Sequence, residues 1–105
     1  MDNSSLNDNQ SEDAINPTME NYNNGSGSRI YAIWQESNSS AEHIRVASSN
    51  GTSWENSVLM NKDSNKIGSN PDLEAFDNGS GSRIYATWSE TNASGHSQIL
   101  SLIHI

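Results

Sequence analysis

The sequence predicts an all-β fold, and three observations support this expectation. Residues 24–32 return unchanged as residues 78–86, which gives the chain an internal repeat with a period of 54 positions. Within each copy, short segments alternate apolar and polar residues with a period of two, as half-buried strands do. These segments are separated by polar stretches rich in Asn, Gly and Ser, which favour tight turns. We therefore expect antiparallel strands in the same arrangement in both copies.

Each copy begins with two predicted strands. Residues 18–22 and 72–76 hold apolar side chains at the same two positions of an alternating pattern. The polar residues 77–82 that follow the second of these segments suit a hairpin loop. The next strand, at residues 29–34 and 83–88, is apolar on both of its faces. Because such a strand must be covered on both sides, we expect it in a sheet that packs between two other sheets.

The first copy supplies two further strands. Ile44 and Val46 alternate in a third strand, residues 49–52 form a turn, and residues 53–60 form a fourth strand before a polar connector at 61–69. Four strands per repeat of this length are typical of a β-propeller blade, and repeat units of this kind need about three or more copies for stability. The second copy stops within its third strand. We therefore predict about two four-stranded antiparallel blades of a β-propeller, which form an incomplete ring.

The repeat divides the chain into three parts. Residues 1–15 form a polar N-terminal segment that we expect to be disordered, residues 16–69 form the first blade, and residues 70–105 form a truncated second blade. The last six residues, 100–105, correspond in frame to the transposase end sequence of a common sequencing-library adapter. We hypothesise that they are adapter read-through and that the natural protein continues differently after Ile99. The alternative is a natural third strand, which the alternating sequence permits.

Composition and charge exclude several functional classes. The 105 residues include 13 Asp and Glu but 5 Lys and Arg, a net charge of −8, whereas binding to nucleic acid needs a basic patch. The absence of cysteine excludes disulfides and thiolate chemistry. No stretch approaches the roughly 18 apolar residues of a membrane span, and the N-terminal residues lack the apolar core of a signal peptide. Hydrophobic residues make up only 31% of the chain, so we expect no large independent core.

The turn after the third strand resembles a known motif. The Asp-box of bacterial-neuraminidase-type repeats, found in sialidase-like β-propellers, reads Ser-x-Asp-x-Gly-x-Thr-Trp. Residues 47–54 keep its Gly, its second hydroxyl residue and its Trp, but hold Ala47 and Ser49 at the Ser and Asp positions. The Arg-Ile-Tyr-Ala-x-Trp strand is also similar to the second strand of long secreted arrays of such repeats in archaea and bacteria. The resemblance covers residues 16–99 and implies that the box supports the turn and lies away from any active site.

The resemblance raises the question of sialidase catalysis, which needs three arginines, a Tyr nucleophile with an activating Glu, and an Asp acid. Three of these side-chain types recur at equivalent positions of the two copies: Arg29 and Arg83, Tyr31 and Tyr85, Glu36 and Glu90. An active site needs different residues from different blades, so residues that recur at equivalent positions are expected to belong to the scaffold. The Arg-Ile-Tyr sequence also differs from the Arg-Ile-Pro signature of sialidases. We therefore predict no catalytic residue in this chain.

The remaining histidines and tryptophans predict no ligand site. His43, His96 and His104 lack the spacing of metal ligands, so we expect neither a metal nor a cofactor. Aromatic side chains such as those of Trp34, Trp54 and Trp88 stack on sugars in some proteins. Packing between blades is nevertheless the role that we expect for all three, because they recur in buried strands or fill the aromatic position of the box.

The function implied by the resemblance is that of a non-catalytic scaffold. Such a propeller would be extracellular or at the cell surface and would bind glycan or protein through loops at one face. Its other partners would be neighbouring blades, supplied by the same parent chain or by further copies in a homo-oligomer; nucleic acid is not expected. The alternative is a fragment of an exo-sialidase or other glycoside hydrolase whose catalytic residues lie outside this chain.

Overall fold

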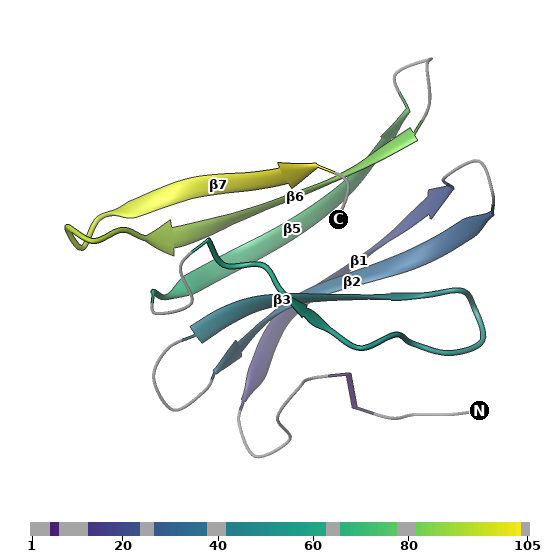
Figure 1. The fold of residues 1–105 in the computed structure, drawn as a ribbon, viewed down its shortest axis with the longest axis horizontal. Coiled ribbons are helices and arrows are strands. Elements are labelled where there is room, and N and C mark those ends of the chain that lie inside the picture. Colours follow the sequence, from purple (N-terminus) through teal and green to yellow (C-terminus); the bar gives the residue numbers. More distant parts are fainter. Residues whose placement is uncertain are drawn as a thin grey trace.

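Two antiparallel β-sheets make up the computed structural model of the chain, which describes residues 5–6, 13–23, 27–37, 42–62, 66–77 and 82–103. The first sheet has the order β1-β2-β3-β4 and the second the order β5-β6-β7. The strands are β1 (Ala14–Asn23), β2 (Ser28–Ser37), β3 (Glu42–Ser49), β4 (Val58–Leu59), β5 (Gly68–Asp77), β6 (Ser82–Thr91) and β7 (Ser97–Ile103). No helix occurs among the described residues, which confirms the all-β prediction. The sheets lie face to face, with β1 and β5 running in the same direction (Figure 1).

The strand boundaries differ from the prediction mainly at β4. Of the predicted strand at residues 53–60, only Val58 and Leu59 pair with β3, and a single bridge joins Ser49 to Trp54. The guanidinium of Arg45 donates hydrogen bonds to both the hydroxyl and the backbone carbonyl of Ser57, at 2.9 and 3.3 Å. At Ser57 the side chain of Arg45 therefore binds the backbone, and the β3–β4 ladder is limited to two residue pairs.

Some predictions fall wholly or partly outside the described residues. The disorder expected for residues 1–15 concerns mostly residues 1–4 and 7–12, which are not described; β1 begins at Ala14. The hairpin loops at residues 24–26 and 78–81 also lie outside, as does His104. Three strands of the second sheet are described, where a complete blade would have four.

Both first strands carry a bulge at an Asn-Pro pair. The pairing register of β1 against β2 shifts around Asn16-Pro17, and that of β5 against β6 shifts around Asn70-Pro71. Asn16 and Asn70 have φ angles of 55° and 53°, in the left-handed region that Asn tolerates better than most residues. The sequence repeat therefore reproduces a backbone feature as well as a strand pattern.

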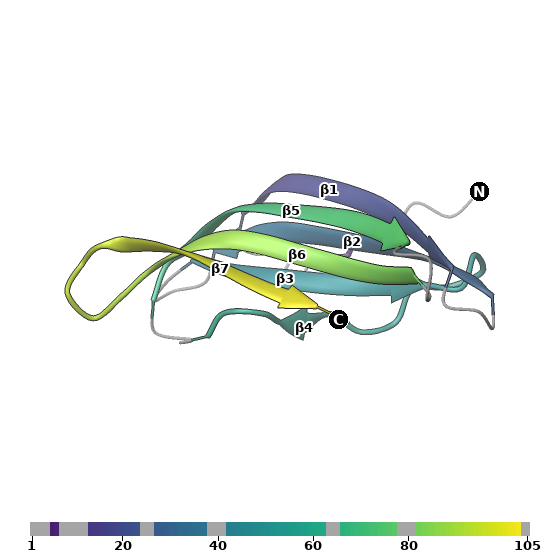
Figure 2. The same ribbon diagram turned by 90° about the horizontal axis from the view of Figure 1, so that it is seen from above.

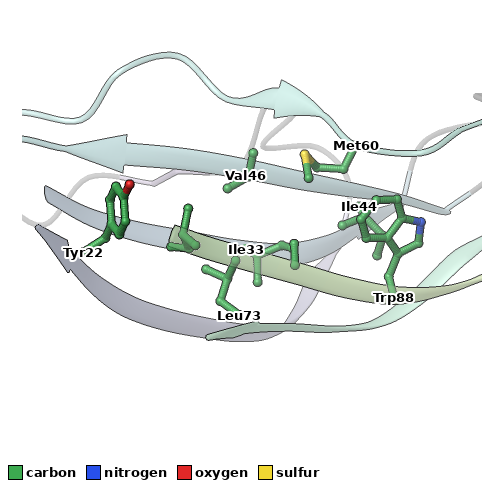
Figure 3. Packing of buried hydrophobic residues seen from close by; sticks show 9 residues of the cluster. Tyr22, Ile33, Ile44, Val46, Met60, Leu73 and Trp88 are labelled. Atoms are coloured by element: carbon green, nitrogen blue, oxygen red, sulfur yellow. The ribbon is translucent and has the colours of Figure 1, made fainter. Parts of the chain in front are cut away.

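The hydrophobic core lies between the two sheets. Buried residues from the first sheet and its connector (Tyr22, Ile33, Ile44, Val46, Met60) meet buried residues from the second sheet (Leu73, Ile84, Ala86, Trp88), as Figure 3 shows. The approach is close at Gly68, where an added Cβ would lie 2.8 Å from Cγ1 of Ile44. A side chain at this position would push β5 away from the first sheet.

The two sheets contact each other through non-equivalent faces: the second sheet uses one face of the repeat unit and the first sheet uses the other. In β6, Ala86 and Trp88 face the core, whereas the equivalent Ala32 and Trp34 of β2 belong to a second cluster on the far side of the first sheet. Ile33 is the residue of β2 that faces the core instead. Figure 2 shows the strands of both sheets in the same order, from β1 and β5 to β3 and β7. The sheets are therefore stacked head to tail, so that unlike faces of the two units are in contact.

Substitution of Asn70 tests the bulge. Asn70→Ala should lower the free energy of unfolding by about 1 kcal/mol, because an ordinary L-residue is strained in the left-handed region. Asn70→Gly should lose less, since glycine adopts positive φ without steric cost. Urea unfolding of both variants at one protein concentration measures the difference. Equal losses for Ala and Gly would show that backbone strain is not what selects Asn here.

Candidate functional site

Each sheet contains a buried hydrogen bond between a Trp and the Glu two residues later. The indole Nε1 of Trp34 donates to Oε1 of Glu36 at 2.8 Å, and Nε1 of Trp88 donates to Oε1 of Glu90 at 3.0 Å. Successive side chains of a strand point to opposite faces, so positions i and i+2 share a face. The repeated Trp-x-Glu sequence therefore places each acceptor beside its donor. Both glutamates, considered above for catalysis, have this structural role.

The connector between the sheets is fixed at both of its ends. Glu90 Oε1 accepts a second hydrogen bond, from the backbone N–H of Lys62, at 2.9 Å. Asn61 accepts from the backbone N–H of Ile44 at 2.6 Å and donates to the backbone carbonyl of Lys66 at 2.9 Å. No role had been predicted for Asn61 from the sequence. Asn61 recurs as Asn7 in the register of the repeat, and this repetition was the signal that could have indicated a structural role.

Arg29 has partners within the first sheet. Its Nη2 donates to Oγ of Ser48 at 3.1 Å and forms an ion pair with Glu55, which lies beyond the turn after β3. The carboxylate of Glu55 is largely exposed, so this pair contributes little to stability. These contacts link β2 to the segment after the turn. Neither of these two partners of Arg29 is another arginine, as a sialidase site would require nearby.

The tyrosines considered for catalysis lie in aromatic pairs. Tyr31 meets Tyr22 edge to face, with ring centroids 6.0 Å apart, and Tyr85 meets Phe76 in the same way at 6.4 Å. The two pairs occupy equivalent positions of the repeat. The first pair is covered by the second sheet, whereas Phe76 is 52% exposed on the outer side of the second sheet.

The turn that resembles an Asp-box is held by two short polar side chains. Oδ1 of Asn50 accepts hydrogen bonds from the backbone N–H groups of Thr52 and Ser53 at 2.9 and 3.2 Å. Oγ of Ser49 accepts from the backbone N–H of Gly51 at 3.0 Å. Gly51 has a φ of 97°, which favours glycine. The side-chain oxygens of Asn50 and Ser49 thus hold the turn, and the position of Asn50 had not been singled out from the sequence.

The tryptophans pack in two separate clusters. Trp88 lies in the core between the sheets. Trp34 is buried on the far side of the first sheet with Ala32 and Ala47, where Trp54 and Leu6 pack against it. The far side of the first sheet is therefore apolar, and Leu6 and Trp54 cover part of it.

A pocket at one end of the molecule is the candidate binding site. It has a volume of about 520 Å³ and lies between the β4–β5 connector and the β6–β7 hairpin. Its lining consists of Lys62, Lys66, Glu90, Thr91, Asn92, Ala93 and Leu100. These are the only two lysines in the chain, so both lysines of an acidic protein line one pocket. No single motif predicted this pocket, because its two walls are distant in the sequence.

The hairpin that forms one wall of the pocket is shaped by Asn92. Its Oδ1 accepts hydrogen bonds from the backbone N–H groups of Ser94 and His96, at 2.9 and 3.1 Å. Gly95 completes the turn with a φ of 86°. The wall is therefore a structured turn.

Comparison of the chain with protein-family models, curated proteins and solved structures gave no match. Within the described ranges, no three His, Cys, Asp or Glu side chains are grouped so that they could hold a metal ion. The described part of the chain also lacks any helix of the length and apolarity needed to span a membrane. The functional interpretation therefore depends on the stacking of the sheets and on the pocket.

Substitution of Glu90 tests its structural role. Glu90→Ala should lower the free energy of unfolding by about 2 to 4 kcal/mol, because it leaves the indole of Trp88 and the backbone N–H of Lys62 without an acceptor. Glu90→Gln keeps an acceptor oxygen and should lose less than half as much. Thermal and urea unfolding measure both variants. Equal effects of Ala and Gln would mean that these two hydrogen bonds do not contribute.

Proposed function

We propose that the two sheets are consecutive blades of a sialidase-like β-propeller that acts as a binding or adhesion scaffold outside the cell or at its surface. The observation that carries this proposal is the head-to-tail stacking, in which the Trp88 side of one unit covers the Ile33 side of the other. Equivalent units that stack in one direction are what a ring of blades requires. The degenerate Asp-box turn and the four strands of the first sheet support the same assignment.

The contacts of the repeated residues favour a scaffold over a catalyst. Glu36 and Glu90 accept hydrogen bonds from buried indoles, Arg29 pairs with Glu55, and Tyr31 packs against the core. A glycosidase site would need such groups gathered around one substrate. Here the same types of side chain tie strands and sheets together.

The pocket between the connector and the β6–β7 hairpin is the proposed ligand site. Loops that a rigid sheet positions are common sites of recognition. Lys62 and Lys66 supply positive charge and Thr91 supplies a hydroxyl to the lining, whereas the Glu90 carboxylate that also lines the pocket is hydrogen-bonded to Trp88 and to the backbone of Lys62. Acidic glycans, which carry a carboxylate or sulfate among many hydroxyls, match this lining, and we propose them as the ligand class.

A glycan array probed with the whole chain tests the proposal. We expect binding to acidic glycans and weaker binding to neutral ones of the same size. The double variant Lys62→Ala/Lys66→Ala should weaken binding at least about tenfold, because hydrogen bonds to charged groups contribute about 1.5 to 3 kcal/mol each. Lys62→Arg/Lys66→Arg is the matched control and should retain binding.

Three outcomes would contradict the proposed function. One is equal binding of neutral and acidic glycans, and another is no binding to either. The third is release of sugar from a glycoside by the chain, which would favour the enzyme.

The melting temperature of the double variant should equal that of the unmodified chain, since both lysine side chains lie at the surface of the pocket.

A further inference from the structure

We infer that the pocket selects sugars that carry a sulfate or phosphate ester over sugars that carry a carboxylate. The selection rests on the proposed function and narrows its ligand class to one tetrahedral anion. The ester group lies at the mouth of the pocket, where Lys62, Lys66 and Thr91 supply the donors. The hydroxyl-bearing sugar ring points inward, toward Glu90.

Hydrogen bonds fix the backbone that carries the two lysines. The N–H of Lys62 and the carbonyl of Lys66 are each bonded to a side chain at 2.9 Å. The backbone N–H of Thr91 also donates to the carbonyl of Ile67, the residue after Lys66, at 3.0 Å. This bond ties the connector to the end of β6, so the two walls of the pocket are joined. A site that is ordered before the ligand arrives loses less conformational entropy on binding.

Positive and negative charges lie at different depths in the pocket. Lys62 is exposed and Lys66 is half-buried, whereas Glu90 is only 4% exposed. The cations therefore stand nearer to the solvent than the carboxylate does. An anion is attracted to the mouth and repelled by the inner wall, while the hydroxyls of a sugar ring can donate hydrogen bonds to a carboxylate. The lining thus favours a ligand with a single anionic group at its outer end.

The donors at the mouth come from both walls of the pocket. Lys62 and Lys66 belong to the connector, and Thr91 ends β6 on the opposite wall. The three terminal oxygens of a sulfate or phosphate ester diverge from the central atom, so they can accept from both walls at once. The two oxygens of a carboxylate lie in one plane and match the forked donors of an arginine, whereas lysine ammonium groups are point charges. The mouth therefore suits a tetrahedral anion better than a planar one.

The three arginines of the chain all lie away from the pocket. Arg29 and Arg45 are bound to side chains of the first sheet and of the segment that follows it. Arg83 lies at the beginning of β6, whereas the pocket lies at the end of this strand. The chain thus has forked cations but places only point charges at the pocket.

Matched pairs of sugars test the preference. Galactose 6-sulfate and galacturonic acid have the same ring and differ in the group at one end, and glucose 6-sulfate and glucuronic acid form a second pair. When both members are displayed at equal density, the whole chain should bind the sulfate ester about fivefold tighter than the carboxylate, which is the effect of about one additional hydrogen bond.

The 6-phosphates of the same two sugars distinguish the two sources of a tetrahedral ester. Tighter binding of the phosphate identifies sugar phosphates as the ligand, and tighter binding of the sulfate identifies sulfated glycans. Both results support the selection of a tetrahedral ester, provided that the preferred ester binds more tightly than the carboxylate.

Lysine signals show where the sugar binds. Because the chain has two lysines, selective ¹³C-lysine labelling gives two sets of side-chain signals. Both sets should shift when galactose 6-sulfate is added. Binding that leaves both unchanged would place the ester elsewhere on the chain and would overturn the inference.

Two variants separate recognition of the ester from a general effect of charge. Lys62→Arg/Lys66→Arg keeps both charges but introduces forked donors, so the sulfate-to-carboxylate ratio of affinities should fall toward one while the carboxylate sugar stays bound. Thr91→Val removes one hydroxyl with little change of shape and should also lower the ratio. Thr52→Val is the matched control, because Thr52 is exposed in the turn after β3 and does not line the pocket. Its ratio should equal that of the unmodified chain.

Failure of this inference differs from failure of the proposed function. Equal binding of the two members of each pair, or tighter binding of the carboxylates, would overturn the selection of a tetrahedral ester and leave the binding of acidic glycans intact. No binding to any of these acidic sugars or to the acidic glycans of the array would contradict the proposed function, and the selection with it.

Discussion

The structure depends on one contact, between the Trp88 side of the second sheet and the Ile33 side of the first. Strand β2 has apolar side chains on both of its faces and β6 has them on its core side, and by itself each sheet would expose this core side to water. Stacking the second sheet on the first buries one face of each. The same contact sets the direction of the stack, because it joins unlike faces of equivalent units. The position of the pocket, between the β4–β5 connector and the β6–β7 hairpin, follows from it.

Hydrogen bonds supplement a core that is small for lack of apolar residues. Gln35, buried between the sheets, accepts from Nδ2 of Asn16 at 3.3 Å and from the backbone N–H of Asn70 at 3.4 Å. Asn61 and Glu90 tie the connector to the first and second sheets respectively. Among the described residues, no buried side-chain nitrogen or oxygen lacks a partner. Each unpaired buried polar group would lower the free energy of unfolding. A chain with only 31% hydrophobic residues has little apolar burial to offset such a loss.

The sequence allowed the strands and their repeat to be predicted, but not the way in which the sheets meet. Alternation shows that Ile33 and Trp34 point to opposite faces, yet it carries no information about which face the second sheet covers. A strand was predicted at residues 53–60, but the short length of β4 was not, because the binding of Arg45 to Ser57 depends on the folded geometry. The pocket joins residues near 62–66 to residues near 90–93, which only the tertiary structure brings together. Polar residues that recur in the repeat, such as Asn61, could have been predicted from the sequence to have a structural role.

A nuclear Overhauser experiment on methyl-labelled protein tests the stacking most directly. The account predicts cross-peaks from the indole of Trp88 and the methyl groups of Leu73 to the methyl groups of Ile33 and Ile44. Cross-peaks from the same two residues to Trp34 instead, or none to the first sheet, would contradict it.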